Sequence, residues 1–191
     1  DPDAVLEKLG GAADCAPDDV EQRHQRGRFT HVNGPLDLYP SPKSARALQM
    51  AGPAGELMYF TRLMPGGSRF GLHGAKSFVD RIFIMVVGGP SLDELRQFYG
   101  DALGLPLWPM DPYPIRQMSR VMGAPEETGY PITMARIPGR SFMLELEELP
   151  GDVEPRAVPD GELPEGLAMV SFSTDSLAEI REQGEVSFRH Q

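Results

Sequence analysis

The residues of this chain that could do chemistry are few and widely spaced. Its 4 histidines, His24, His31, His73 and His190, show no spacing typical of a metal site, and Cys15 is the single cysteine. A lone cysteine excludes a disulfide framework and a thiolate metal cluster. His31 lies in a strand-like stretch, FTHVNG. There it either faces a ligand cavity or is simply a polar residue at the end of a strand.

Two charged residues, Glu145 and Arg81, lie in stretches that the sequence predicts to be strands. Glu145 alternates with Leu144 and Leu146 in MLELEE, so it faces away from them if the stretch is a strand. It is then either a surface glutamate or a carboxylate that can act as a base. Arg81 shares a face with apolar residues at alternate positions, which predicts partial burial and a need for an acidic partner.

Aromatic residues supply the remaining candidates. Tyr59 lies in a strand-like stretch and is more typical of a core residue than of a site. The run from Trp108 to Tyr113 either lines the mouth of a ligand site or only seals the domain. We take His31, Tyr59, Trp108 and Tyr113 as candidate substrate-binding residues.

The composition narrows the classes of partner. The chain has 191 residues, of which 40% are hydrophobic, enough for one or two domains with a sizeable core. Its net charge of −10 argues against nucleic acid and against anionic membrane surfaces as partners. No apolar run approaches the ~20 residues of a membrane span and no secretory signal is evident, so we expect a cytoplasmic protein.

Residues 78–105 are the stretch around which the chain is organised. Val79 to Val87 is an apolar run rich in β-branched residues, which predicts a buried strand. After a Gly-Gly-Pro sequence, Ser91 and the glutamate three positions later form a capping box, which predicts a helix. Apolar residues recur at helical spacing up to Gly104, where we expect the helix to end.

A shift of 85 positions relates distant parts of the chain. SLDEL at 91–95 is echoed by SLAEI at 176–180. GPAGELMYFTRLMPGG at 52–67 is echoed by IPGRSFMLELEELPGD at 137–152. One offset serves two separate stretches and is longer than the roughly 20–50 residues of solenoid repeats, so it indicates a duplicated half-domain.

The middle copy of this repeat has the predicted order strand, helix, three strands. Two such modules, when paired, bury the exposed faces of both sheets around a common cavity suited to a ligand. The predicted elements outside the organising stretch are a helix at 1–9, strands at 29–32, 46–50, 56–63, 115–121, 130–137, 141–149 and 167–173, a loop at 106–114 and a helix at 176–182.

This pattern resembles the vicinal oxygen chelate superfamily, which includes glyoxalase I, bleomycin-resistance proteins and extradiol dioxygenases. The matching residues are Phe98-Tyr99, Leu103-Gly104-Leu105, the Gly52 to Gly55 turn before 56–63, and Glu145. The resemblance covers about residues 1–182. It implies an α+β fold of tandem βαβββ modules whose paired sheets curl around a central cavity.

The resemblance also implies a divalent metal site, which this sequence does not complete. The family's ligand positions fall on Arg81 and Glu145 in the middle copy, on Tyr59 or Phe60 in the first, and near 167–169 in the next. Arginine has no lone pair for a metal, and a single carboxylate is not a site. We therefore assign no metal ligand. Arg81 and Glu145 are the candidate catalytic residues, with Glu145 expected to be ionised beside the guanidinium. Alternatively, Glu145 is only the structural partner of a half-buried Arg81.

The predicted domain organisation follows the repeat. We expect a first module at 1–64 whose first strand is missing, a linker at 65–77, a second module at 78–149, a linker at 150–166, and the truncated start of a third at 167–191. The function that this implies is a glyoxalase-like or dioxygenase-like enzyme for a small oxygenated substrate. A metal-free small-molecule-binding protein and a structural or regulatory use of the fold stay open. The cofactor is unknown, and a homodimer is possible.

Overall fold

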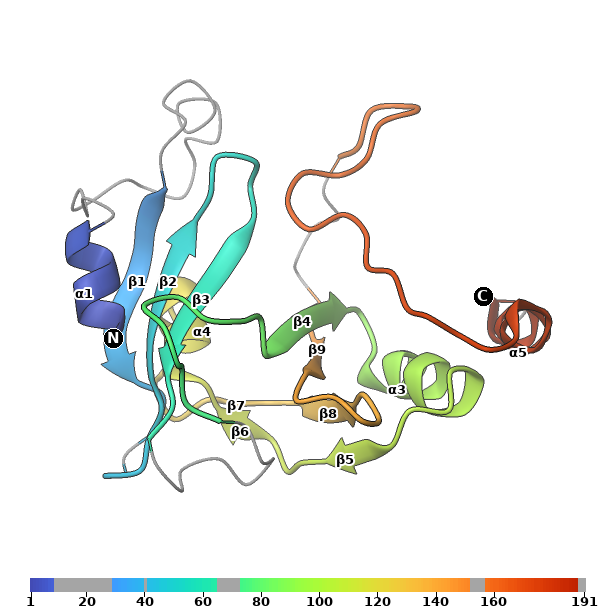
Figure 1. Ribbon diagram of the computed structural model, residues 1–191, viewed down its shortest axis with the longest axis horizontal. Helices are drawn as coiled ribbons and strands as arrows, with labels where there is room; N and C mark the ends of the chain where they lie inside the picture. The colour runs from blue at the N-terminus through green and yellow to red at the C-terminus, as the bar shows by residue number, and fades with distance from the viewer. Residues whose placement is uncertain (9–28, 40, 65–72, 152–156, 189–191) are drawn as a thin grey trace. The chain divides into compact units, whose positions relative to one another are not determined.

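The computed structural model describes residues 1–8, 29–39, 41–64, 73–151 and 157–188 (Figure 1). It has helices and several sheets, so the predicted α+β class is confirmed. The chain forms two compact units, each built from separate stretches of the sequence. The first comprises Asp1–Asp80, Ile115–Glu127 and Pro155–Val170, and the second Arg81–Pro114, Thr128–Glu154 and Ser171–Gln191.

The first unit is a three-stranded antiparallel sheet in the order β1-β2-β3. One face of this sheet is covered by α1, where Val5 packs against Leu48 and Met50. The helix packs there because Leu48 and Met50 alternate along β2 and so share one face. The elements of the unit are α1 (Pro2–Lys8), β1 (Thr30–Asp37), β2 (Arg46–Ala51), β3 (Leu57–Arg62) and α4 (Arg116–Val121).

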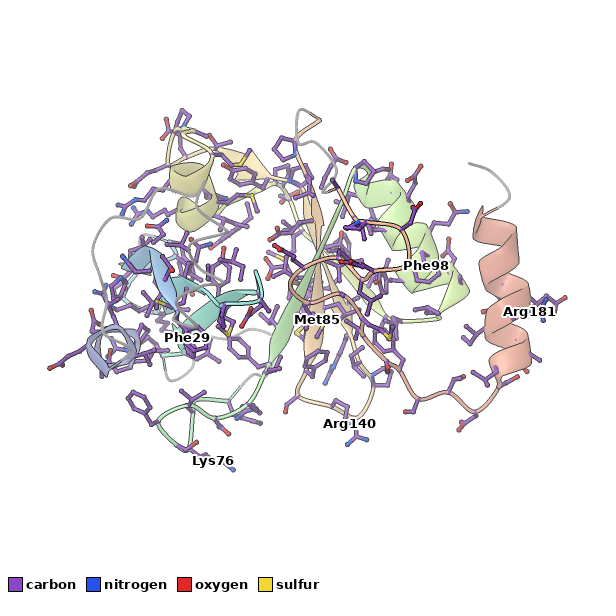
Figure 2. The ribbon with its side chains drawn as sticks, turned by 90° about the horizontal axis from the view of Figure 1, so that it is seen from above. Phe29, Lys76, Met85, Phe98, Arg140 and Arg181 are labelled. Atoms are coloured by element: carbon purple, nitrogen blue, oxygen red, sulfur yellow. The ribbon has the colours of Figure 1, made fainter. Side chains whose placement is uncertain are left out.

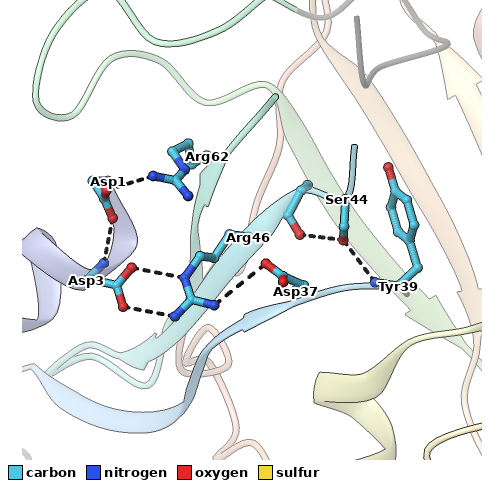
Figure 3. Close-up of polar contacts among 8 residues, drawn as sticks. Asp1, Asp3, Asp37, Tyr39, Ser44, Arg46 and Arg62 are labelled. Carbon is cyan, nitrogen blue, oxygen red and sulfur yellow. Dashed lines mark hydrogen bonds and ion pairs between the residues drawn. The ribbon is translucent and has the colours of Figure 1, made fainter. Parts of the chain in front are cut away.

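Ion pairs join α1 to the sheet of the first unit (Figure 3). The Arg46 guanidinium donates two hydrogen bonds to the Asp3 carboxylate, at 2.9 and 3.0 Å, and lies 3.6 Å from Asp37. Arg62 donates to Asp1 at 2.8 Å. The bond from Arg46 lowers the pKa of Asp3, since a guanidinium favours the ionised carboxylate.

The second unit is a four-stranded mixed sheet in the order β4-β9-β8-β5, beside a small β6-β7 ribbon. The strand β4 is parallel to β9, and the other neighbours are antiparallel. Along the chain this sheet reads strand, helix, strand, strand, strand. The elements are β4 (Ile84–Gly89), α3 (Leu92–Arg96), the π-helical η1 (Gln97–Ala102), β5 (Leu107–Pro109), β6 (Tyr113–Pro114), β7 (Gly129–Tyr130), β8 (Ile132–Arg136), β9 (Met143–Glu148) and α5 (Leu177–Phe188).

The helix that follows β4 begins directly after Ser91, as the capping box in the sequence predicts. Ser91 Oγ accepts a hydrogen bond from the Glu94 amide at 3.3 Å. The amide of Leu92 donates to Glu148 Oε2 on β9 at 3.0 Å, so a carboxylate from the sheet also satisfies the first turn. Gly104, with φ +65°, follows the last helical turn as predicted.

The core of the second unit lies between its sheet and this helix. Leu144 and Leu146 of β9 are fully buried there with Ala135 of β8. Figure 2 shows the side chains, with Met85 labelled on β4 and Phe98 on η1. The residues that pack around the three buried ones are Met85, Val87, Leu92, Leu95, Tyr99, Leu105, Leu107, Ile137 and Phe142.

Both units contain a hairpin at the place that the repeat relates. In the first, Met50 pairs with Met58, and in the second, Ala135 pairs with Leu144. The offset is therefore 85 positions on the first strand and 86 on the second. The connection runs over 52–56 in one hairpin and over 137–142 in the other, which accounts for the extra position.

Three predicted strands differ from the structure. Where a strand was predicted at 115–121, Arg116–Val121 forms the helix α4, in which Arg116 and Arg120, one turn apart, both pair with Glu126 at 3.3 and 3.1 Å. The strand that follows the helix in the chain is β5, which lies inside the loop predicted at 106–114. The strand predicted at 79–87 begins only at Ile84. Residues 167–173 form no strand, because no neighbouring strand of the described chain pairs with them.

Candidate functional site

The two faces of β9 carry different chemistry. Leu144 and Leu146 point into the core beneath the helix, so Glu145 and Glu147 point to the other face of the sheet. This confirms the orientation that the alternation in MLELEE predicted for Glu145. Glu147, which the sequence alone did not single out, is on the same face and only 7% exposed.

The side chains of Glu145 and Glu147 lie on the same face of β9, close enough for each carboxyl group to shift the pKa of the other. Burial raises the pKa of Glu147 to about 8, helped by the charge and the hydrogen bond of Glu145. Burial also raises the pKa of Glu145, against the opposing effect of its hydrogen bond to Glu147. The expectation that Glu145 is readily ionised is therefore wrong. Near neutral pH the pair retains a proton, since Glu147 is buried, its pKa lies near 8, and a neighbouring carboxylate disfavours its ionised form.

The residues beside this pair form a row across the sheet. Val86 of β4, Glu145 of β9, Met134 of β8 and Trp108 of β5 are successive partners in register, so they share one face. Met134 is buried, whereas Val86 and Trp108 are 44% and 47% exposed. Trp108, predicted in a loop, is thus on the face of the acidic pair, two strands or about 10 Å from Glu145.

Arg81 does not lie on the strand where the sequence placed it. Pairing of β4 with β9 starts where the Met143 amide donates to the Phe83 carbonyl, at 3.0 Å, two residues beyond Arg81. The residue in register with Glu145 is Val86. Arg81 is half-buried, in agreement with its apolar neighbours in the sequence. A direct contact between Arg81 and Glu145 stays a prediction.

The structure separates the remaining candidates. Tyr113 lies on β6 opposite Tyr130 of β7, outside the four-stranded sheet. His31 Nε2 donates to the Gly34 carbonyl of its own strand at 2.8 Å. His31 is also in register with Met50, which packs under α1, so it lies on the helix side of the first sheet.

Tyr59 is part of a polar row on the other face of the first sheet. Asn33 of β1, Gln49 of β2 and Tyr59 of β3 are partners in register. Gln49 is 2% exposed and its Nε2 donates to the Tyr59 hydroxyl. Within the described part of the chain its Oε1 is buried with no hydrogen-bond partner. Sequence reasoning missed Gln49, although a glutamine inside the apolar strand RALQMA is the signal that could have found it.

Tyr59 occupies the same position in its hairpin as Glu145 does in the second unit. Gln49 pairs with Tyr59 as Met134 pairs with Glu145. Across the residues that the structure describes, no group of three or more His, Cys, Asp and Glu side chains comes together to hold a metal. Glu145 and Glu147 are carboxyl groups of the second unit whose pKa values are raised by burial, so they are its candidate reactive groups.

The chain was compared with three sets of known proteins. Neither the models of protein families, nor the curated proteins, nor the solved structures contain a match to the chain. No helix in the described ranges is both long and apolar enough to cross a membrane. What the site can do follows from the acidic pair and its surroundings.

Proposed function

We propose that the chain is a vicinal-oxygen-chelate-like enzyme that acts on a small oxygenated organic substrate, with Glu145 and Glu147 as its proton-transfer group. The observation that carries the proposal is the pair of neighbouring carboxyl groups on one face of β9, in which Glu147 is only 7% exposed and its pKa is raised to about 8. A general acid or base works best when its pKa lies near the working pH.

A pair that holds one proton can both donate and accept. Its ionised carboxylate would take a proton from a carbon next to a carbonyl, and the protonated partner would donate to the substrate oxygen. These two steps are the core of isomerase and lyase chemistry, two of the reaction types that the resemblance implies. Trp108, on the same face and half exposed, would pack against the carbon skeleton of the substrate.

The topology of each unit supports the finer form of the fold proposal. The second unit has the β-α-β-β-β order with its first strand parallel to its last, and the first unit has a helix followed by three strands. We propose that the two are tandem modules of one fold, paired around a central cavity.

A metal-free binding protein of the same fold is the second candidate. The buried Gln49 amide favours it, since Oε1 has no protein partner within the described residues and can accept a hydrogen bond from a ligand. The neighbouring Tyr59 hydroxyl would add a second polar contact. This polar row needs no proton transfer to hold an oxygenated molecule.

Deuterium exchange tests the enzyme proposal over a whole class of substrates at once. Small 2-oxo and 2-hydroxy carbonyl compounds are incubated with the protein in D₂O, and loss of the C–H signal is followed by proton NMR. Wild type is compared with Glu145→Gln and Glu147→Gln, and with Glu94→Gln as a control, because Glu94 is exposed on α3.

The enzyme proposal predicts exchange that both site variants reduce by about 100-fold or more and the control does not change. Each sample is measured as purified without chelator, with its metal content determined by elemental analysis, and again after addition of divalent metal. Saturable binding of a compound, with no exchange or turnover either before or after the addition of metal, would instead favour the binding protein.

A further inference from the structure

The face of the second sheet that carries the acidic pair also carries a cation. Ala135 of β8 lies in the core with Leu144, so Met134 and Arg136 point to the opposite face, that of Glu145. Arg136 is the last residue of β8 and is exposed, whereas the four residues before it are buried. The sheet therefore presents a solvent-accessible guanidinium on the face of the carboxyl groups.

The strand register places Arg136 diagonally across from Glu145. Met134 is the partner of Glu145 in β9, and Arg136 is the partner of Met143, one pleat further along. Diagonal neighbours of this kind lie about 7–8 Å apart, within reach of long side chains. The backbone amide of Arg136 donates to the Pro106 carbonyl at 3.0 Å, which ties the end of β8 to the start of β5. The guanidinium is thus carried by a paired strand and not by a loop.

Arg136 does not serve as the counter-ion of the acidic pair. Burial and the neighbouring Glu147 act on the pKa of Glu145, and the charge of Arg136 takes no part. A guanidinium placed against the carboxylate would lower that pKa, so the two groups stand apart. Within the described ranges, no ion pair or side-chain hydrogen bond joins Arg136 to another residue. Its charge can therefore pair with a ligand.

A guanidinium beside a proton-transfer pair favours one class of substrate. It binds a carboxylate through two parallel hydrogen bonds. In a chain with a net charge of −10, an anionic substrate needs such a cation at the site to offset repulsion by the acidic pair. The diagonal spacing of Arg136 and Glu145 suits a carboxylate and a reactive C–H group that are two bonds apart. A 2-oxo acid has this form, with carboxylate, carbonyl and C–H on successive carbons.

We propose that Arg136 binds the substrate carboxylate, so that the substrate of the proposed enzyme is a 2-oxo acid. The inference rests on the proposed proton-transfer role of Glu145 and Glu147. Their ionised carboxylate takes a proton from the third carbon of the acid, and the electrons of that C–H bond form the C=C bond of an enol. The carbonyl oxygen receives the other proton of the pair. The reverse steps return the ketone with a solvent deuteron on the third carbon.

Fluorescence of Trp108, the single tryptophan of the chain and the partner of Met134, reports ligand binding on this face. The full chain is titrated with 2-oxobutanoate and with its neutral amide, 2-oxobutanamide, which has the same C–H group. Arg136→Gln is compared with Arg140→Gln, the exposed arginine in the turn of the same hairpin (Figure 2). We expect wild type and Arg140→Gln to bind the acid at least ~10-fold more tightly than the amide. Arg136→Gln should lose this preference, and Arg136→Lys, which keeps the charge, should restore part of it.

Deuterium exchange at the third carbon separates this inference from the proposed function. We expect Arg136→Gln to raise KM for 2-oxobutanoate by ~10-fold or more and to leave exchange of the amide unchanged. Binding of the acid that requires Arg136, without exchange, would support the carboxylate site and contradict the enzyme. Equal binding of acid and amide by wild type, an equal loss of both in Arg136→Gln, or binding of neither compound would overturn the carboxylate site.

Discussion

Glu147→Gln should make the protein more stable at mildly alkaline pH. The substitution keeps the shape of the side chain, removes its ability to ionise, and leaves an amide that can donate to Glu145. In wild type the buried carboxyl of Glu147 has a pKa of about 8, against 4.5 for the same group in water. The folded state therefore binds this proton much more tightly than the unfolded state does.

The sign and size of the effect follow from proton linkage. The contribution of Glu147 to stability is fully present below pH 4.5 and is lost as the pH rises towards 8, because unfolding then releases the proton. With about 1.4 kcal/mol per pH unit, the loss between pH 5 and pH 8 is about 3 kcal/mol. Glu147→Gln has no carboxyl group to lose this proton. Its free energy of unfolding relative to wild type should therefore rise by about 3 kcal/mol from pH 5 to pH 8.

Urea unfolding at pH 5 and pH 8 measures the difference, with Glu94→Gln as the control for removal of an exposed carboxylate. In thermal unfolding the relative gain corresponds to about 6–12 °C for a chain of this length. A stability difference between Glu147→Gln and wild type that is the same at both pH values would refute the raised pKa.

Three further predictions concern the framework of the two units. Arg46→Met should cost about 0.5–1 kcal/mol in urea unfolding, less at high salt, because the bonds to Asp3 are partly exposed; equal loss at 1 M salt would contradict an ionic origin. Ser91→Ala should cost about 1 kcal/mol through loss of the helix cap, and Ser91→Asp should restore it. Leu146→Ala should cost about 2–5 kcal/mol, since Leu146 is fully buried; a loss under 1 kcal/mol would mean that the core is not packed as described.

Local sequence signals predicted the features of the fold that depend on neighbouring residues. The capping residue Ser91 and the terminal Gly104 placed the helix of the second unit, and the alternation around Glu145 gave the buried and opposite faces of β9. Both patterns act through the backbone within one turn or one pleat. The α+β class follows from these elements.

Long-range effects were not predictable in the same way. In the helix at 116–121 two arginines one turn apart pair with Glu126, and the apolar-polar alternation of the sequence does not reveal these contacts. Glu147 was missed, and Glu145 was expected to be ionised, because burial of the pair depends on the packing of the whole sheet. The strand predicted at 167–173 has no partner in the described structure, and a strand forms only beside another.

The pairing of two modules around a cavity, the domain boundaries, the cytoplasmic location and the homodimer stay predictions. The acidic pair is the point at which the proposed function can be tested inside a single unit.

The most direct measurement is a pH titration of the glutamate side-chain carboxyls by ¹³C NMR in protein labelled at glutamate. The signals of Glu145 and Glu147 are assigned from Glu145→Gln and Glu147→Gln. The proposed proton-transfer pair predicts that Glu147 titrates near pH 8 and that its midpoint falls when Glu145 is replaced, since Glu145 contributes to the raised pKa. Titration of both carboxyls near pH 4–5 would contradict it, because neither group could then hold a proton at neutral pH.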